Sequence, residues 1–512
     1  MPKGQASECL LSSLRKESAL LMIRCFALGI ITTLLSALWG AVASADDTVD
    51  GVTVGSEVVI GAPPLPVLSD SATSDPAASR PRAARDDRGE ASASASGRRS
   101  LPIPAQPGRD LGEIGVPATD ENSLPSLLDF IPHHGPRGAL VAEVIYTGET
   151  FTLARGGLID RRTTNFRGNL DMVLTLDLEV AAGIQGGRIF VYGQNVHGDP
   201  LSLRSVGDFQ LFSNIDSTIS DTDRPQFTAV AEYWYEQQLV DDTVRLKFGK
   251  QDANADFAYS DVAGDFVHSS FGLAPTIPLP TFPSQALGAA MFWAATDDIV
   301  LGGGVYDGTL PDGPQGVRWG FDTLGHNGAM FLTQCEWTGQ TGPNEQLPWT
   351  VRLGGWHHNA DDLWTDFAVV PNPKESNGGG WIIGDRMLFK ESYGSDDAQG
   401  LAGFAMYSWT RADRNVFDSS LAAGLVYSGL VPRRDEDLLG VGVAVANLSD
   451  DFREAELRNS TILETREIAT ELFYKCRLTP AVTLQPEMQY ITNPGAQYSD
   501  AVLWGLRFEA VL

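Results

Sequence analysis

Charged side chains alternate with apolar ones in two consecutive segments of the chain. Arg245 and Lys247 occupy alternate positions in one segment, and Glu232 and Glu236 share one face of the segment before it. Charged groups form strong hydrogen bonds, so these four side chains could bind a polar solute that carries many hydroxyl groups. If the two segments are adjacent strands, the same charges could instead satisfy one another across the strands as ordinary wall.

Three other groups of residues suggest chemistry, but their spacing does not support it. The run DANAD at 252–256 begins like a calcium loop, yet its sixth position is Phe257 rather than Gly and its twelfth is Ala263 rather than Glu. The run HSS at 268–270 lacks the G-x-S-x-G pattern of a hydrolase serine. The pair HH at 133–134 has no third ligand nearby. We therefore expect no catalytic residue, metal site or cofactor.

The composition excludes several classes of protein. The chain has 512 residues, with 37 Lys and Arg against 65 Asp and Glu, and its net charge is −28. A nucleic-acid binder needs a basic face, so this charge argues against nucleic acid as a partner. Four Cys exclude a disulfide scaffold, and Cys335 and Cys476 are expected to be free thiols facing lipid. The mean hydropathy of −0.09 excludes a helical membrane bundle.

The N-terminal part of the chain has the composition of a targeting segment followed by a linker. Basic residues precede an apolar stretch from Cys25 to about Ala41, and an Ala-Ser-Ala site ends at Ala45. This order predicts a secretory signal peptide over 1–45, although a single transmembrane anchor is the competing interpretation. Residues 46–136 are rich in Ser, Ala, Pro, Asp and Arg, which predicts a disordered low-complexity linker.

From Gly138 onward, apolar and polar side chains alternate with a period of two, which is typical of strands. In the last segment the apolar Trp504, Leu506 and Phe508 alternate with a mixed set that includes Arg507. A face that carries apolar and aromatic side chains suits lipid. We predict sixteen strands, at 139–147, 168–180, 187–197, 226–238, 243–251, 285–296, 299–307, 327–338, 349–359, 379–391, 400–411, 418–428, 437–448, 464–477, 480–491 and 500–512.

The predicted connections between these strands are sorted by length. Odd-numbered connections such as 148–167, 198–225, 252–284 and 360–378 are long, and most even-numbered ones are short. Bacterial outer-membrane barrels sort their connections in this way, with short periplasmic turns and long external loops. The fold predicted for 137–512 is therefore all-β, a 16-stranded antiparallel transmembrane β-barrel. Sixteen strands enclose an aqueous channel rather than a packed interior.

The connection 252–284 is the longest, and it is rich in aromatic residues and proline. An apolar loop of this length is usually functional and should not remain in solvent. We expect it to fold into the barrel and narrow it, the alternative being an outer cap. Folded inward, it could place Asp256 and Asp261 opposite the two bases. Trp234 and Trp356 fall on the lumen face, where each could stack on the apolar face of a solute or belong to an interfacial girdle.

Several stretches resemble the carbohydrate-selective porin family of the OprB type. The matching stretches are 424–442, Glu467 with Glu471-Leu472 and Tyr474, Gln485-Pro-Glu-Met-Gln489, Asn493-Pro-Gly495, Trp234-Tyr-Glu-Gln237 and Phe271-Gly272. The resemblance implies passive diffusion of sugars through a sixteen-stranded barrel in the outer membrane of a Gram-negative bacterium. The chain departs from such barrels in its long N-terminal linker and in ending at Leu512 rather than at Phe.

The expected partners are small-molecule sugars and outer-membrane lipid, and a homotrimer is one assembly to consider. The candidate pore-lining and sugar-contact residues are Arg245, Lys247, Glu232, Glu236, Trp234, Asp256, Asp261, Arg507, Glu471 and Gln489. Two alternatives remain open from the residues, an outer-membrane barrel enzyme such as a hydrolase and a structural barrel or adhesin.

Overall fold

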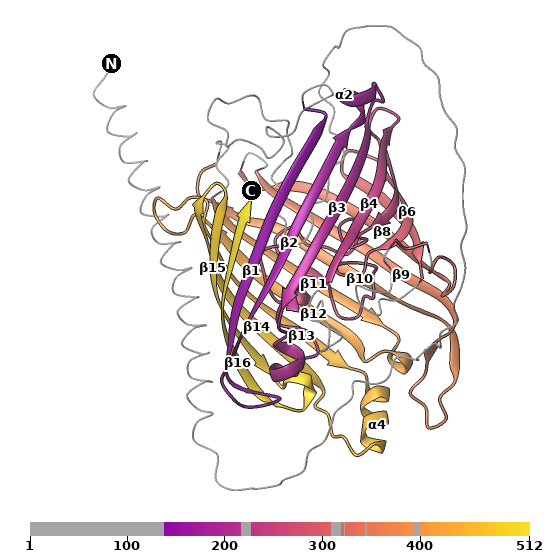
Figure 1. Cartoon of the computed structure of the whole chain (residues 1–512), viewed down its shortest axis with the longest axis vertical. Helices are drawn as coiled ribbons and strands as arrows, with labels where there is room; N and C mark the ends of the chain where they lie inside the picture. Colours follow the sequence, from indigo (N-terminus) through magenta and orange to yellow (C-terminus); the bar gives the residue numbers. More distant parts are fainter. Residues whose placement is uncertain are drawn as a thin grey trace. The chain divides into compact units, whose positions relative to one another are not determined.

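A computed structural model of the chain describes residues 138–216, 227–308, 319–321, 323–343, 346–393 and 399–511. The expected signal peptide and linker, His133-His134 and Leu512 lie outside these residues. The described residues form sixteen strands (Figure 1). They are β1 Leu140–Gly157, β2 Thr163–Asp177, β3 Gly187–Gly198, β4 Phe227–Leu239, β5 Val244–Gln251, β6 Ala286–Ala294, β7 Ile299–Asp307, β8 Ala329–Thr341, β9 Leu347–Thr365, β10 Pro373–Lys390, β11 Gly400–Thr410, β12 Phe417–Ser428, β13 Leu438–Leu448, β14 Arg466–Thr479, β15 Val482–Thr492 and β16 Ser499–Val511.

The strands form one closed antiparallel barrel. Each strand pairs with its neighbours in sequence, and β1 pairs with β16, with Ile145 opposite Val511 and Gly148 opposite Phe508. Closure leaves no free sheet edge, which is the condition for β-structure in a bilayer, where unpaired backbone groups cannot bind water. The predicted fold class, an all-β 16-stranded antiparallel barrel, is confirmed.

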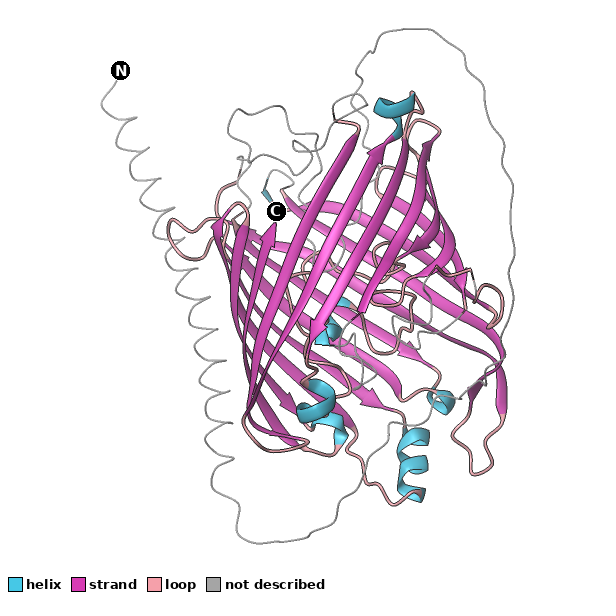
Figure 2. Ribbon diagram, viewed as in Figure 1, coloured by secondary structure: helices cyan, strands magenta, loops and turns pink. Residues whose placement is uncertain are grey.

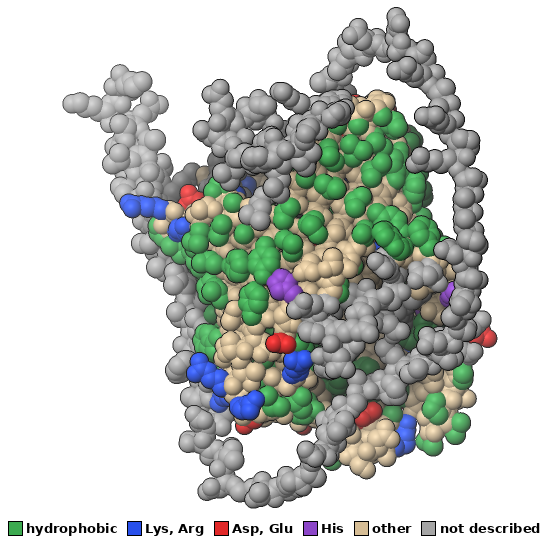
Figure 3. All heavy atoms as spheres, viewed as in Figure 1, with side chains coloured by type: hydrophobic (Ala, Val, Ile, Leu, Met, Phe, Trp, Pro, Cys, Tyr) green, Lys and Arg blue, Asp and Glu red, His purple; other side chains and the backbone are tan. Residues whose placement is uncertain are grey.

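The outer wall of the barrel is apolar. Side chains such as Met172, Phe248, Met291 and Trp504 project outward and are exposed. Figure 3 shows hydrophobic side chains spread over the visible wall, with most charged side chains toward its ends. Because strand residues alternate between the two faces, the polar residues between them point into the lumen. The same period of two thus produces both a lipid surface and a hydrophilic interior.

Two connections that the sequence predicts to be long are short turns. β1 continues to Gly157 and β2 begins at Thr163, so the first connection is only 158–162. The ninth is 366–372, because β9 and β10 extend toward each other in the same way. In the extension of β1, the outward-facing Thr152 hydrogen-bonds Thr164 of β2 at 2.8 Å. Because outward-facing residues near this end of β1 are polar, apolar and polar side chains no longer alternate there. The sequence pattern therefore ends the strand too early and predicts too long a connection.

The remaining helical elements are short (Figure 2). They are α2 Leu178–Ala182, η3 Ser202–Val206, α3 Ser269–Gly272, η6 Ala412–Arg414, α4 Asp450–Arg458 and η7 Pro494–Ala496. Figure 1 shows α2 at one end of the barrel and α4 at the other. The long connections 199–226, 252–285 and 449–465 all lie at the α4 end. In the described part of the chain, no helix combines the length and apolar character needed to span a membrane.

Candidate pore constriction

Residues 252–285, hereafter the β5–β6 loop, run along the inside of the barrel wall. Hydrogen bonds tie the loop to strands far apart in the ring: Ala258 N donates to Gln334 of β8, Ser260 Oγ donates to Asp385 of β10, and Lys475 of β14 pairs with Asp265. β5 and β14 lie on nearly opposite sides of a sixteen-membered ring. The loop therefore fills lumen space. The predicted inward folding is confirmed, and the outer cap is excluded.

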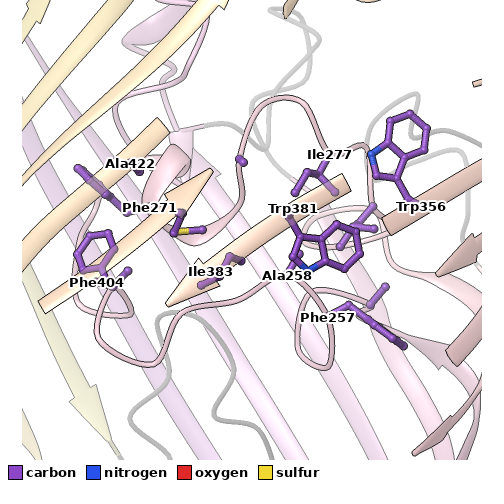
Figure 4. Close-up of a cluster of buried hydrophobic side chains, with 14 of the residues drawn as sticks. Phe257, Ala258, Phe271, Ile277, Trp356, Trp381, Ile383, Phe404 and Ala422 are labelled. Carbon is purple, nitrogen blue, oxygen red and sulfur yellow. The ribbon is translucent and has the colours of Figure 1, made fainter. Parts of the chain in front are cut away.

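The apolar side of the β5–β6 loop packs against the inner wall. Phe257, Ala258, Phe271 and Ile277 of the loop share one buried cluster with wall residues from β6 to β14, among them Trp356, Trp381, Ile383, Phe404 and Ala422 (Figure 4). Phe266 lies 4.9 Å from Phe473 and 5.5 Å from Phe404, measured between ring centroids. Burying each phenylalanine stabilises the packed loop by about 1.5–3 kcal/mol. The apolar composition seen in the sequence is explained by this contact.

The first charged anchor of the loop is Asp256. Its carboxylate accepts hydrogen bonds from Arg245 Nη2 at 2.6 Å and from Lys247 Nζ at 2.8 Å, and all three side chains are buried. Glu236 accepts from Arg245 at 3.1 Å. Burial opposes ionisation of Asp256, but the charges of Arg245 and Lys247 outweigh it and lower its pKa to about 2. The predicted approach of Asp256 to these bases is observed as direct contact.

The second charged anchor involves a residue that the sequence did not single out. Arg352 of β9 pairs with Asp261 of the loop at 2.7 Å, with Glu336 at 2.8 Å and with Asp385 at 2.8 Å. Its guanidinium also lies 4.0 Å from the centroid of the Tyr259 ring. Asp261 therefore does not face Arg245 and Lys247, contrary to expectation. Arg352 occupies a lumen position of the alternating pattern, but nothing in the sequence identifies its partners.

Residues 199–216, the described part of the connection between β3 and β4 and hereafter the β3–β4 loop, also enter the barrel. The carboxylate of Glu467 on β14 accepts hydrogen bonds from the backbone N–H groups of Phe209 and Gln210 at 2.9 and 2.8 Å. Ser213 Oγ donates to Glu149 at 2.6 Å. The two loops touch each other, because Asn214 N donates to Val267 O at 3.2 Å.

Three further candidate residues, Glu471, Gln489 and Arg507, lie beside the inserted loops. Glu471 accepts from the backbone N–H groups of Val267 and His268, both at 2.8 Å, and Gln489 Nε2 donates to Phe212 O at 2.8 Å. Glu471 and Gln489 are fully buried. Arg507 forms an ion pair with Glu149 and remains partly exposed. The structure thus brings these residues to the constriction, where two of them hold loops and present no surface to a solute.

The two tryptophans are occupied by protein neighbours. Trp234 stacks on Phe190 of β3 at 4.6 Å, and Lys247 of β5 lies 4.6 Å from its ring centroid. Since β3 and β5 flank β4, the ring is covered from both sides. Trp356 is buried in the loop–wall cluster. Neither ring presents an open face for stacking, and neither forms part of an exposed girdle.

The remaining candidate, Glu232, is buried beside the start of the loop. Its carboxylate accepts from Trp234 Nε1 and from Asp252 N, each at 3.1 Å. Burial, reinforced by the charge of Glu232, raises the pKa of Asp252 to about 6. Within the described ranges, no group of three or more His, Cys, Asp and Glu side chains is arranged to hold a metal ion. Cys335 and Cys476 are both free thiols, as predicted.

The inner wall is chemically divided around the ring. The apolar cluster takes all its wall residues from β6 to β14. Lumen-facing positions on β15, β16, β1 and β2 instead carry Gln485, Glu487, Arg507, Thr147, Asn169 and Asp171. These six residues form a polar arc beside a second buried apolar cluster, in which Phe151, Leu153, Ile491 and Leu503 of the wall pack against both loops.

Comparisons with known proteins agree with this geometry. The model of the carbohydrate-selective porin family, OprB family, matches residues 161–512. Porin B of Pseudomonas aeruginosa is 24% identical over 396 residues, which cover 72% of this chain and 86% of that protein. Putative porin QuiX of Acinetobacter baylyi is 23% identical over 382 residues, covering 69% of this chain and 84% of that protein.

A solved structure shares the fold. The high-pH structure of Pseudomonas putida OprB aligns with a TM-score of 0.64 at 23% identity, covering 73% of this chain and 94% of that chain. The family and these relatives are porins, which are channels rather than enzymes, and the family together with the barrel indicates the outer membrane of a Gram-negative bacterium. Because the family model extends from the β1–β2 connection to the C-terminus, the chain belongs to the OprB family of carbohydrate-selective porins.

Proposed function

We propose that the barrel allows passive diffusion of sugars and other small hydrophilic solutes across the outer membrane. The observation that carries this proposal is the β5–β6 loop, which lies inside the barrel with its apolar side against β6 to β14. The loop narrows the lumen, and its apolar side chains are packed against the wall. A sugar that passes along the polar arc can replace the hydrogen bonds of its hydration water with bonds to the wall. An apolar solute cannot do so.

The ten candidate residues are proposed to shape this passage, in two ways. Asp256, Arg245, Lys247 and Glu236 form a buried charge network that holds the start of the loop. Glu232, Trp234, Glu471 and Gln489 support the loops from the wall. Asp261 and Arg507 are the charged candidates that keep solvent-exposed surface, and these are the strongest candidates for direct contact with a solute.

The rest of the chain fits export to the outer membrane. We propose that residues 1–45 are a signal peptide cleaved after Ala45, and that residues 46–136 form a linker ahead of the barrel at 137–512. Sugars and lipid would then be the partners of the barrel, and assembly as a homotrimer is tested by the mass of the detergent-solubilised complex.

The test of the proposed function is liposome swelling with the purified barrel and sugars of graded size. Monosaccharides are expected to enter fastest, with a size limit set by the loops, and a planar bilayer should show discrete ionic conductance steps. A correctly assembled barrel that neither swells liposomes nor conducts ions would contradict the proposal and favour a structural barrel or adhesin.

A further inference from the structure

Two carboxylates on one strand hold the two inserted loops in the same way. Glu467 accepts the backbone N–H groups of two successive residues of the β3–β4 loop, at 2.9 and 2.8 Å. Glu471 accepts those of two successive residues of the β5–β6 loop, both at 2.8 Å. Because the two glutamates are four residues apart on β14, both project from the same face of the strand. One strand therefore contacts both loops through the same type of interaction.

In the described part of the chain, hydrogen bonds rather than ion pairs account for the burial of these carboxylates. Both side chains are fully buried, and among the described residues neither forms an ion pair within 4.0 Å. A buried carboxylate is costly unless hydrogen bonds satisfy it. The backbone N–H pairs supply those bonds, together with Gly495 N, which donates to Glu467 at 2.6 Å. The interaction fixes the backbone of each loop and does not depend on the loop side chains at those positions.

The two loops are also joined to each other directly beside these glutamates. Ser269 N donates to Leu211 O at 3.1 Å, and Ser270 Oγ lies 3.0 Å from Gln210 Oε1. Gln210 is itself one of the residues held by Glu467. A displacement of one loop would therefore be transmitted to the other through this contact.

We propose that Glu467 and Glu471 are positioning residues that set the pore aperture, by fixing the β3–β4 and β5–β6 loops as one constriction. The inference rests on the proposed function, since it assigns the size limit of that channel to two residues of the wall. Neither glutamate touches the solute. Each acts through the loop backbone that it holds, and the loop–loop contact makes the two glutamates act together.

The test compares Glu467→Gln, Glu471→Gln and the double variant in planar bilayers and in liposome swelling. Glutamine keeps the shape of glutamate but can offer one oxygen instead of two, so one N–H donor of each pair loses its acceptor. Excursions to a larger conductance level should become about tenfold more frequent in each single variant, which corresponds to about 1.4 kcal/mol. Swelling with larger sugars should rise relative to monosaccharides. The effect of the double variant should differ from the sum of the single effects.

The matched control is Glu143→Gln, which removes a lumen-facing carboxylate of β1 that forms no hydrogen bond or ion pair with the described part of either loop. It should leave the aperture unchanged. If the glutamine variants do not assemble, Glu471→Asp keeps the charge and shortens its reach, and Ser270→Ala removes only the loop–loop contact; both should still raise the frequency of large-conductance excursions. An unchanged aperture in assembled variants of a conducting barrel would overturn the inference alone. A wild-type barrel that does not conduct would overturn the proposed function.

Discussion

At the scale of single residues, we expect the loss of the Arg352 side chain to lower the free energy of unfolding strongly. Its side chain is 3% exposed and forms ion pairs with Glu336, Asp385 and the half-exposed Asp261. Replacing Arg352 by Ala leaves the buried Asp385 and the partly buried Glu336 without this counter-charge, so the free energy of unfolding should fall by about 3–5 kcal/mol. Urea unfolding of the detergent-solubilised barrel, followed by its electrophoretic mobility, measures this change.

The contrasting variant at the same site is Asp261→Asn. The Asp261 carboxylate is 48% exposed, so losing its charge should change the free energy of unfolding by no more than about 1 kcal/mol. If Asp261→Asn and Arg352→Ala lower the free energy of unfolding equally, the ion pairs of Arg352 with Glu336 and Asp385 do not provide most of its contribution to stability.

The charge networks also show which residue contacts the sequence can predict. Asp256 follows closely after β5, so the chain can bring it back only to nearby wall residues, and its contact with Arg245 and Lys247 was predictable. The contact between Arg352 and Asp261 joins residues 91 positions apart. Its existence depends on how far the loop extends around the wall. Bonds to backbone N–H groups, such as those of Glu471, have no sequence signature because every residue except proline carries that donor.

At the scale of elements, removing most of the β5–β6 loop should widen the channel. Deletion of residues 262–280 takes away Phe266 and Phe271, which fill lumen space against β11 and β14. Single-channel conductance should rise, and the size limit for sugars should relax. The barrel should also unfold at lower urea, because the deletion uncovers apolar side chains of the inner wall. Unchanged conductance in an assembled deletion variant would mean that another segment sets the aperture.

The packed loop should loosen in acid because of His268. Burial lowers the pKa of His268 to about 3, against an ordinary value of 6.5. Between these values a released loop binds a proton on His268 while the packed loop does not, so lowering the pH from 6.5 toward 3 favours release. Excursions to larger conductance should therefore become more frequent as the pH falls.

A variant of His268 separates the effect of its protonation on the loop from that of carboxyl groups in the loops. Burial raises the pKa of Asp208 in the β3–β4 loop to about 6, and this group has the opposite sign, since its packed form keeps a proton to higher pH. Asn at position 268 can still accept the hydrogen bond that His268 receives from Ser270 N, but it does not titrate. His268→Asn should reduce the acid-induced excursions; an identical pH dependence in wild type and variant would exclude His268 as their origin.

The positions of the strands were predictable because contact with lipid requires apolar side chains on the outer face of the barrel and not on the inner face. Wherever the wall meets lipid, outward residues must be apolar and the period of two appears, as in Met172 of β2 and Trp504 of β16. Beyond the bilayer the outward residue is free to be Thr152, and the prediction ends the strand too early. Local alternation therefore locates the membrane-spanning part of each strand and not its full length.

At the scale of the whole molecule, the sorting of connections predicts the orientation of the barrel in the membrane. The long connections 199–226 and 449–465 share one end, and the short connection 295–298 lies at the other. Long loops should face outside and short turns the periplasm. A protease-cleavable tag at Asp221, a position outside the described residues, or after Ser460 should be cut in intact cells. The same tag between Asp297 and Asp298 should be protected until the outer membrane is permeabilised. Reversed or equal accessibility would contradict this assignment of the two ends. If the accessibility is reversed, the constriction loops enter the pore from the periplasmic side.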